Sequence, residues 1–410
     1  MTDSNVAAVP RLSGKRVAMV MFSTYPFDPR PRRAADSLLK EGASVEMICL
    51  ADEKSPKQEI LNGIDVHRVS VKHRRGNKLD YAYQYAAFIT ISTAILAARS
   101  LRRRYDLVYV HNMPDVLVMS ALVPKIFGAK VVLDQHDPMP ELMKTIYGLE
   151  ENSLSVRIIK KLEKWSIGFV DRVVTVNMAC KKIFSARSCR PEKVSIVMNA
   201  PDESIFPFQP RDARKSSLLT DKSFKIMYHG SIVERNGLDI GIAAFARVLE
   251  TIPNAELRIC GTKTAFLNQI MEQVKERGLT DKVHFLGPKR LEQLVEEIEK
   301  CDVGIIPNHR NAFTDINTPT RLFEYLSLGA PVIAPRTPGI QDYFDPDSLL
   351  FFDAGNAEEL AQKIEYVASH PHETDVIVKR GQEVYLANTW TRQRQTLTDM
   401  VGDLLNGEQA

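Results

Sequence analysis

The sequence predicts an α/β protein built from two doubly wound, parallel-sheet domains. Short apolar runs without polar alternation recur along the chain, as in strands that are buried on both faces. Helix-length segments separate many of these runs, which indicates repeated βα units. The 410 residues also exceed what one hydrophobic core accommodates, about 250–300 residues, so two domains are expected.

The first half begins with a strand over Arg16–Phe22, followed by an amphipathic helix that ends near Gly42. Further buried strands are expected at Val45–Leu50, Leu107–Val110, Lys130–Leu133, Arg172–Val176 and Val194–Val197. Helices are expected over 81–104, 115–127 and 153–168.

A proline-rich, charged stretch, APDESIFPFQPRDARKSS, follows Asn199 and has no hydrophobic period. This composition is typical of an interdomain linker. A second βα series then begins, with strands expected at Phe224–His229, Glu256–Cys260, Val283–Leu286, Val303–Ile306, Pro331–Ala334 and Leu349–Phe352. Helices are expected over 237–250, 264–277, 290–300, 319–328, 356–368 and 372–386. A cleft between two such domains is a natural ligand site.

Composition and targeting signals exclude several classes of protein. Lysine and arginine (54) nearly balance aspartate and glutamate (51), which argues against a nucleic-acid partner. Five scattered cysteines without a CxxC pair offer no zinc site and no disulfide framework, so a reducing, cytoplasmic location is expected. The polar N-terminus lacks the apolar segment of a signal peptide. No stretch reaches the roughly 18–20 apolar residues that a membrane span needs.

The stretch NAFTDINTPTRLFEYLSLGAPVIA is the most informative part of the chain. Thr318 is expected to cap a helix that starts at Pro319, and the N-terminus of such a helix suits a phosphate. Arg321 and Glu324 lie three residues apart on one face. An arginine matches phosphate as a fork, and a carboxylate accepts from a vicinal diol such as ribose. A surface Arg–Glu pair is the alternative.

The block TPTRLFEYLSLGAPVIAP resembles the donor-site block of GT-B glycosyltransferases, especially the retaining, nucleotide-sugar-dependent family 4. Other blocks stand in the order of this family: YPFDPRPRRAADSLLKEGASVEMICL, YDLVYVHNMPD, KVVLDQHDPMPE, DRVVTVN, YHGSIVERNGLDIGIAAFARVL, ELRICG, VHFLGPK and CDVGIIP. The resemblance spans nearly the whole chain. It implies the GT-B fold, in which two Rossmann-like domains face each other across a cleft.

The resemblance also implies a role for each part of the chain. Residues 1–200 would bind the acceptor and residues 201–385 the nucleotide sugar, which is a co-substrate rather than a cofactor. Residues 386–410 would form a helix that crosses back to the first domain, anchored by Trp390.

For the donor, the resemblance implies that Glu324 binds the ribose hydroxyls and that Arg321 and the backbone at Asn317 and Thr318 face the diphosphate. Gly230 would let the diphosphate approach the backbone. Arg235 would stabilise the charge of the departing diphosphate and so act in catalysis.

Three positions depart from the family pattern. Ser231 and Asn236 stand where the family's glycine turn usually carries Arg and Lys. Ile316 replaces a glutamate used near the sugar, and either the adjacent Asp315 takes its part or backbone N–H groups do.

In the first half, His136 follows a strand, at the edge of the sheet where ligands bind. The resemblance implies that it contacts the sugar, as a catalytic residue. Asp137 and Glu141 would contact the acceptor or brace the loop, and His111 is interpreted as structural. Asp28 and Arg30, with their neighbours, either contact an acceptor or a lipid-linked phosphate, or form a solvated helix N-terminus.

No cluster shows convincing metal-ligand spacing, and the DxD-like Asp345-Pro346-Asp347 is interpreted as a turn, so neither a metal nor a cofactor is expected. GxSxG and Walker motifs are absent, as is a GxGxxG after the first strand.

Basic residues flank the apolar segment 81–98: Lys72, His73, Arg74, Arg75 and Lys78 before it, and Arg99, Arg102, Arg103 and Arg104 at its end. This pattern fits either a core helix with a cationic last turn or a peripheral contact with an anionic membrane, on the inner face of the plasma membrane.

The sequence therefore predicts a retaining glycosyltransferase that moves a sugar from a nucleotide-diphospho-sugar to a glycan or polyprenyl-linked acceptor, in surface polysaccharide biosynthesis. Two alternatives are a sugar-nucleotide epimerase of similar fold and a degenerate, non-catalytic subunit of a polysaccharide assembly complex.

Overall fold

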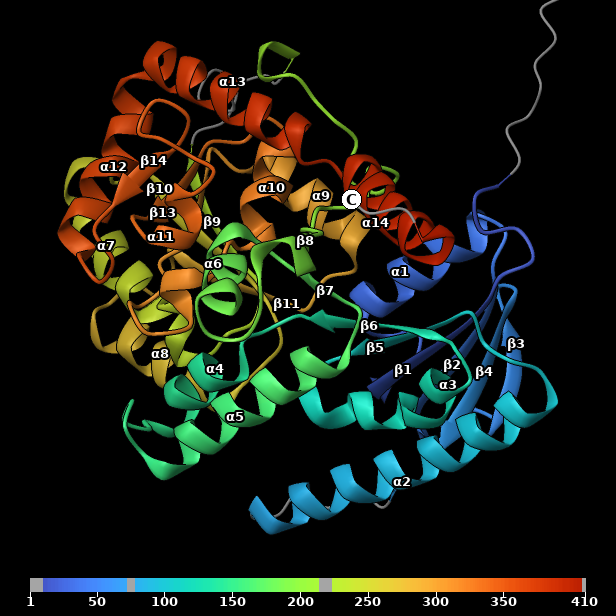
Figure 1. Cartoon of the computed structure of the whole chain (residues 1–410). Helices are drawn as coiled ribbons and strands as arrows, with labels where there is room; N and C mark the ends of the chain where they lie inside the picture. Colours follow the sequence, from blue (N-terminus) through green and yellow to red (C-terminus); the bar gives the residue numbers. More distant parts are fainter. Residues whose placement is uncertain (1–9, 72–77, 214–222, 408–410) are drawn as a thin grey trace, which may run out of the picture. The chain divides into compact units, whose positions relative to one another are not determined.

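The computed structural model describes residues 10–71, 78–213 and 223–407. The chain divides into two compact units, one of Met1–Met198 together with Gln393–Ala410 and one of Asn199–Arg392. Each unit is a sheet with helices packed on it (Figure 1).

The first unit contains an eight-stranded sheet in the order β3-β4-β2-β1-β5-β6-β7-β8. All neighbouring strands are parallel except β3 and β4, which form an antiparallel pair. The central strand β5 is buried along its whole length, as its unbroken apolar run predicts. The strands are β1 Arg16–Thr24, β2 Ser44–Leu50, β3 Gln58–Leu61, β4 Ile64–Val69, β5 Leu107–His111, β6 Lys130–Gln135, β7 Arg172–Thr175 and β8 Val194–Ile196.

The helices of the first unit are α1 Pro29–Lys40, α2 Lys78–Arg102, α3 Leu122–Ile126, α4 Met139–Tyr147, α5 Leu154–Phe169 and α6 Met178–Arg187, with the 3-10 helix η1 over Asp115–Ala121. The helix α14, Trp390–Asn406, begins at the boundary between the units, and its residues from Gln393 belong to the first unit. There, the side chain of Gln393 accepts from the backbone of Met198 (2.8 Å), and Arg11 pairs with Asp399.

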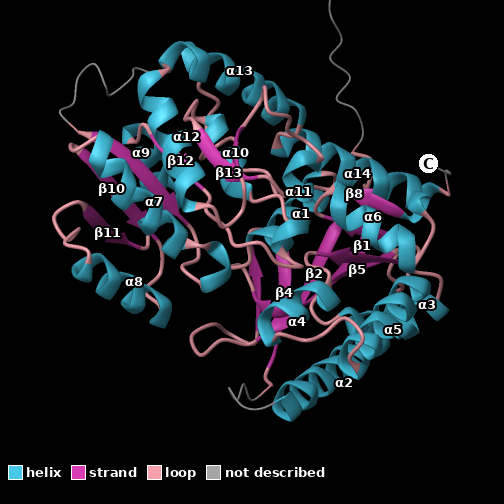
Figure 2. Ribbon diagram, turned by 90° about the vertical axis from the view of Figure 1, so that its left-hand side faces the viewer, coloured by secondary structure: helices cyan, strands magenta, loops and turns pink. Residues whose placement is uncertain are grey.

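The second unit contains a six-stranded sheet in the order β11-β10-β9-β12-β13-β14, parallel throughout (Figure 2). Its strands are β9 Phe224–His229, β10 Ala255–Cys260, β11 Val283–Gly287, β12 Val303–Ile305, β13 Val332–Pro335 and β14 Leu350–Phe352. Its helices are α7 Leu238–Thr251, α8 Ala265–Glu276, α9 Leu291–Lys300, α10 Thr320–Ser327, α11 Pro338–Gln341, α12 Ala357–Ser369 and α13 Pro371–Ala387.

The strand orders place a topological switch between β1 and β5 in one sheet and between β9 and β12 in the other. In open α/β sheets, ligands bind outside the carboxyl ends of the strands at such switch points. Each unit therefore has one edge where a site is expected.

The predicted strands and most predicted helices are present, with local differences; over 115–127, for example, the 3-10 helix η1 and the short helix α3 replace the single helix that was predicted. The chain from Gln58 to Val69 forms a hairpin that was not expected. The segment predicted as an interdomain linker begins at the division between the two units, at Asn199; as far as it is described it is part of the second unit, and Phe206 within it is buried. The helix α10 starts at Thr320, one residue later than predicted, because Pro319 rather than Thr318 occupies the N-cap.

Helix α2 packs through one narrow stripe, in which Gln84, Phe88, Ser92 and Leu96 are buried at four-residue spacing. Most of the basic cluster predicted before this helix lies outside the described residues, at 72–77. Within the part of the chain that the structure describes, no helix combines the length and apolar character that membrane crossing requires.

Candidate functional site

A pocket of about 330 Å³ lies at the carboxyl ends of β9, β10 and β11 in the second unit. Its lining includes His229 and Gly230 from the end of β9, Lys289 after β11, and Arg321 and Glu324 from α10. These residues come from three separate blocks of sequence. We call this space the donor-side pocket.

Helix α10 presents Arg321 and Glu324 because its other face is buried. Leu322, Phe323 and Tyr325 pack inward and are fully buried. The ring of Tyr325 passes directly over β12 at Gly304, where a Cβ would lie 2.3 Å from the ring. A side chain larger than hydrogen at this position would therefore displace α10 from the sheet.

Glu324 is held by a chain of buried hydrogen bonds. Burial raises the pKa of Tyr325 well above its usual value, so its hydroxyl keeps its proton and donates to the backbone oxygen of Met227 (3.0 Å). The same hydroxyl accepts from Nδ1 of His229 (2.9 Å), and Nε2 of His229 lies 2.6 Å from Oε2 of Glu324. A proton must lie between these last two atoms, and Oε1 of Glu324 is left for a ligand.

Arg321 does not pair with Glu324 as in the surface-pair alternative. Its guanidinium donates to the backbone oxygen of His229 (2.9 Å) and to Oδ1 of Asn308 (3.0 Å), and it stacks over the ring of Tyr228. Gly230 makes room for it: this residue has a φ of +123°, and a Cβ here would lie 3.1 Å from Cδ of Arg321. Gly230 is thus required by Arg321 itself, and not solely by the approach of a diphosphate.

The other predicted donor residues lie outside the lining of this pocket. Arg235 stands on the turn after Gly230, with its guanidinium 5.9 Å from the ring centre of Phe313. The hydroxyl of Thr318 points to the backbone oxygen of Gly339 (2.7 Å), and Asn317 closes the short turn before α10. Asp315 pairs with Arg310; it is the neighbour of Ile316, which stands where the family pattern has a glutamate.

Two ionisable residues of the pocket, His229 and Lys289, were not predicted from the sequence. His229 is the last residue of β9, and its position directly before Gly230 was the available signal. Lys289 closes the block VHFLGPK and brings a second cation to the pocket beside Arg321.

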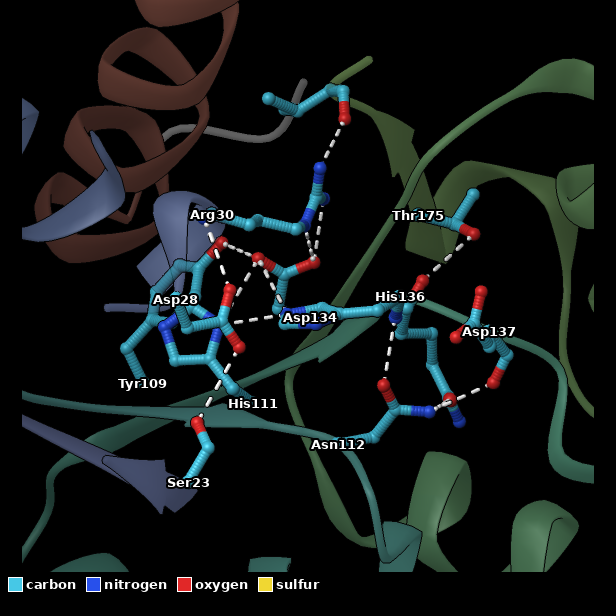
Figure 3. Close-up of polar contacts among 12 residues, drawn as sticks. Ser23, Asp28, Arg30, Tyr109, His111, Asn112, Asp134, His136, Asp137 and Thr175 are labelled. Atoms are coloured by element: carbon cyan, nitrogen blue, oxygen red, sulfur yellow. Dashed lines mark hydrogen bonds and ion pairs between the residues drawn. The ribbon is translucent and has the colours of Figure 1, made fainter. Parts of the chain in front are cut away.

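A second pocket, of about 250 Å³, lies in the first unit at the carboxyl ends of β1, β5 and β6. Its lining includes Ser23 and Asp28, His111 and Asn112, and the predicted residues His136 and Asp137 (Figure 3). We call it the acceptor-side pocket. His111, interpreted as structural from the sequence, belongs to its wall.

Asp134, the next-to-last residue of β6, is the buried centre of this polar cluster. It pairs with Arg30 through Oδ1 (2.6 Å) and accepts from the hydroxyl of Tyr109 (2.9 Å) through Oδ2. Burial alone would raise the pKa of Asp134, but the charge of Arg30 and the hydrogen bond from His111 outweigh it and hold this pKa well below its usual range.

The prediction that Arg30 contacts an acceptor does not fit this position. Its side chain is 8% exposed, and its remaining guanidinium nitrogen donates to the backbone oxygen of Val197 (2.8 Å). Asp28 caps α1 by accepting from the backbone of Arg30 (3.2 Å) and stays at the pocket wall. The N-terminus of α1 thus turns its arginine inward, toward the anion on β6.

His136 is neutral in this setting. Its Nε2 lies 3.0 Å from Nδ1 of His111, and both rings stand near the carboxylate of Asp134. Burial lowers the pKa of His136 to about 3, helped by the charge of Arg30 and opposed by that of Asp134. The imidazole can therefore exchange hydrogen bonds with a ligand without carrying charge.

Asn112 fixes the loop that carries His136. Its amide donates to Oε1 of Gln135 (2.6 Å) and to the backbone oxygen of Asp137 (2.9 Å), and it accepts from the backbone of His136 (2.8 Å).

Glu141 lies outside the pocket, where both of its oxygens accept from Arg187 (2.7 and 2.9 Å). This geometry fits the bracing alternative for Glu141 rather than contact with an acceptor.

Among the residues that the structure describes, His111, Asp134 and His136 form the group that could hold a metal ion, since their ligand atoms lie within 4.8 Å of one another. Two observations argue against this use. Arg30 already neutralises Asp134, and Nε2 of His111 is buried without the partner that orients a ligating histidine.

The DxD-like triplet Asp345-Pro346-Asp347 forms a turn, as predicted: Asp345 accepts from the backbone of Asp347 (3.1 Å).

Solved structures with this architecture are glycosyltransferases of the GT-B fold. Sucrose-phosphate synthase from Thermosynechococcus elongatus aligns with a TM-score of 0.77 at 17% identity, covering 96% of this chain and all of that one. HepE from Anabaena, solved with UDP-glucose, aligns with a TM-score of 0.70 at 16% identity, covering 95% and 99%. The fold predicted from the sequence is confirmed.

Family profiles agree with the fold. Residues 32–204 match Glycosyltransferase Family 4, and residues 210–384 match Glycosyl transferases group 1, so the chain belongs to this family of glycosyltransferases. A D-inositol 3-phosphate glycosyltransferase from Acidothermus cellulolyticus is 21% identical over 80% of this chain and 76% of its own length. The GPI3 subunit of the phosphatidylinositol N-acetylglucosaminyltransferase from Saccharomyces cerevisiae is 20% identical over 80% and 68%.

Proposed function

We propose that this glycosyltransferase binds a nucleoside-diphosphate sugar in the donor-side pocket and transfers the sugar, with retention of anomeric configuration, to a glycan or polyprenyl-linked acceptor. One observation carries the proposal. A carboxylate with one free oxygen, Glu324, and the cations Arg321 and Lys289 line a single pocket of about 330 Å³ at strand carboxyl ends. These groups match the diol and the diphosphate of such a donor.

In the proposed reaction, Glu324 accepts hydrogen bonds from the ribose, while Arg321 and Lys289 face the diphosphate. The acceptor hydroxyl attacks the anomeric carbon on the face from which the diphosphate leaves. The bond from that carbon to the diphosphate oxygen breaks, and the same oxygen takes the hydroxyl proton. Arg235, on the turn beside the pocket, stabilises the charge that develops on the diphosphate. This route uses neither a metal nor a covalent intermediate.

The acceptor is proposed by analogy with relatives. The yeast and Acidothermus relatives are named for phosphatidylinositol and for inositol 3-phosphate, both phosphorylated polyols. A probable glycosyltransferase WbjE from Pseudomonas aeruginosa is 21% identical over 59% of this chain and 60% of its own length. We place the reaction in surface polysaccharide assembly and in the cytoplasm, where the five free cysteines would stay reduced.

The donor assignment is tested by a thermal-shift screen of UDP-, GDP- and other sugar nucleotides, followed by calorimetry with the best donor. Glu324→Ala is expected to weaken binding roughly tenfold or more, because hydrogen bonds to a charged group contribute about 1.5–3 kcal/mol each. Unchanged donor affinity would remove the ribose role. Lys275→Ala, an exposed lysine on α8, is the control.

Two rival functions predict different products. An epimerase would convert the sugar nucleotide to a new one without any acceptor. A non-catalytic subunit, suggested by Ser231, Asn236 and Ile316, would bind the donor and transfer nothing across a broad acceptor panel. Transfer to any acceptor with the anomeric configuration of the donor preserved would support the proposed reaction.

A further inference from the structure

Helix α5 carries an exposed apolar stripe on the first unit. Leu154, Ile158, Leu162 and Trp165 are 71%, 47%, 43% and 46% exposed, respectively. Their spacing of four, four and three residues places them on one face of the helix. Large apolar side chains gathered on one surface indicate an interaction site rather than random exposure.

The same helix exposes basic residues beside this stripe. Three basic residues are exposed beside the stripe: Arg157, Lys161 and Lys164. Each stands one position before a residue of the stripe, which places it on the adjacent side of the helix. The one acidic residue of α5, Glu163, is fully buried and pairs with Arg187. The exposed face of α5 is therefore half apolar and half cationic.

Neighbouring elements extend the surface. Helix α4 packs against α5 and exposes Ile146 and Tyr147 at its end. Both helices lie on the same side of the eight-stranded sheet as α2 (Figure 1). The acids nearest along the chain, Glu150 and Glu151, precede the stripe, and Glu151 is neutralised by Lys144 and Lys160.

We infer that the exposed face of α5 binds an anionic membrane surface, with the apolar stripe in the interfacial region and the basic flank against lipid phosphates. Charge complementarity selects this occupant: an interfacial helix pairs apolar side chains with lysine and arginine and avoids exposed acids. From the sequence, membrane contact was one of two alternatives for α2, the other being a core helix; the face that combines an apolar stripe at helical spacing with a basic flank is that of α5. The inference goes beyond the proposed function and does not depend on it.

The test is flotation of the full chain with phosphatidylcholine vesicles that contain phosphatidylglycerol, compared with phosphatidylcholine alone. Binding is expected to require the anionic lipid and to fall as salt is raised, because salt screens surface charge. Lys161→Glu with Lys164→Glu should weaken binding by roughly fivefold or more per lysine. Ile158→Ser with Leu162→Ser should weaken vesicle binding at both low and high salt.

Matched controls separate this surface from general charge and hydrophobicity. Lys275→Glu on α8 and Ile60→Ser on β3, which alter a lysine and an apolar residue exposed elsewhere, should leave vesicle binding unchanged. In a Trp390→Phe background, Trp165 is the remaining tryptophan, and its fluorescence should shift to the blue on vesicle binding.

Two results would overturn the inference. One is vesicle binding by the α5 variants that equals that of the unaltered chain. The other is a stripe-dependent dimer in solution, seen by light scattering, which would make the face a contact between copies. Donor affinity, measured in parallel by calorimetry, keeps the outcome separate from that of the proposed function.

Discussion

The contact between His229 and Glu324 lends itself to a decisive experiment, because the two nitrogens of the imidazole have different partners. Nε2 contacts Glu324 at 2.6 Å, and Nδ1 contacts the hydroxyl of Tyr325 at 2.9 Å. A glutamine at position 229 places its amide near the Nε2 position, whereas an asparagine places it near Nδ1. The two substitutions therefore keep opposite halves of the chain of hydrogen bonds.

The expected magnitude follows from the geometry. Hydrogen bonds to a charged group contribute roughly 1.5–3 kcal/mol, which corresponds to about tenfold to a hundredfold in an equilibrium constant. His229→Asn should weaken donor binding within this range, because Glu324 loses the partner that holds its carboxylate toward the pocket. His229→Gln should stay within about threefold of the unaltered enzyme, since the contact to Glu324 is kept.

The assay is calorimetric titration with the preferred sugar nucleotide. Tyr325→Phe is the control: it leaves the backbone oxygen of Met227 without its donor and should cost about 1–3 kcal/mol of unfolding free energy, with little change in donor affinity. Equal losses of affinity in His229→Asn and His229→Gln would refute the positioning role. So would an unchanged affinity in His229→Asn.

Three further predictions concern Arg235, Lys289 and His136. Arg235→Ala should lower kcat by roughly tenfold to a hundredfold while donor affinity changes little, because its charge acts on the departing diphosphate; equal losses in steady-state kinetics and calorimetry would contradict this role. Lys289→Ala should weaken a nucleoside diphosphate more than the matching monophosphate in competition binding, and equal weakening would place the lysine away from the second phosphate. Because the pKa of His136 is lowered to about 3, the folded chain lacks a proton that the unfolded chain binds below about pH 6.5, so this residue makes stability fall as the pH drops, by about 1.4 kcal/mol per pH unit. His136→Gln should flatten that slope in urea denaturation between about pH 6.5 and 4.5, and parallel pH profiles would show that His136 is not buried in its neutral form.

Sequence patterns predicted the sheets well because a buried parallel strand shows itself as a short run of consecutive apolar residues. They failed where one or two residues decide the local structure. Asn62 and Gly63 form the turn between β3 and β4, and an Asn-Gly pair is a strong hairpin signal that was available. The prolines of the predicted linker gave no sign that the segment packs, but Phe206, between Pro201 and Pro207, is buried and the segment belongs to the second unit.

The candidate sites divide in the same way. Glu324 and Arg321 could be predicted as neighbours because both lie on one helical turn inside the recognisable block TPTRLFEYLSLGAPVIAP. The residues with which these side chains pair could not be predicted, because they are far away in the sequence. His229 meets Glu324 across 95 residues, and Arg30 meets Asp134 across 104. Without the fold, a basic loop residue such as Arg30 is indistinguishable from a surface contact for phosphate.

The corrected position of Arg30 changes what the acceptor-side pocket can hold. None of the described residues that line it is a lysine or arginine. Its polar side chains are the hydroxyls of Ser23 and Tyr85, the carboxylates of Asp28 and Asp137, the amide of Asn112 and the two imidazoles. These groups suit the hydroxyls of a neutral sugar and repel a phosphate. A lipid-linked acceptor would therefore place its terminal sugar here and its phosphate elsewhere. Since His136, with a pKa near 3, is also a weak base, the proposed reaction gives the proton of the attacking hydroxyl to the departing diphosphate rather than to this imidazole.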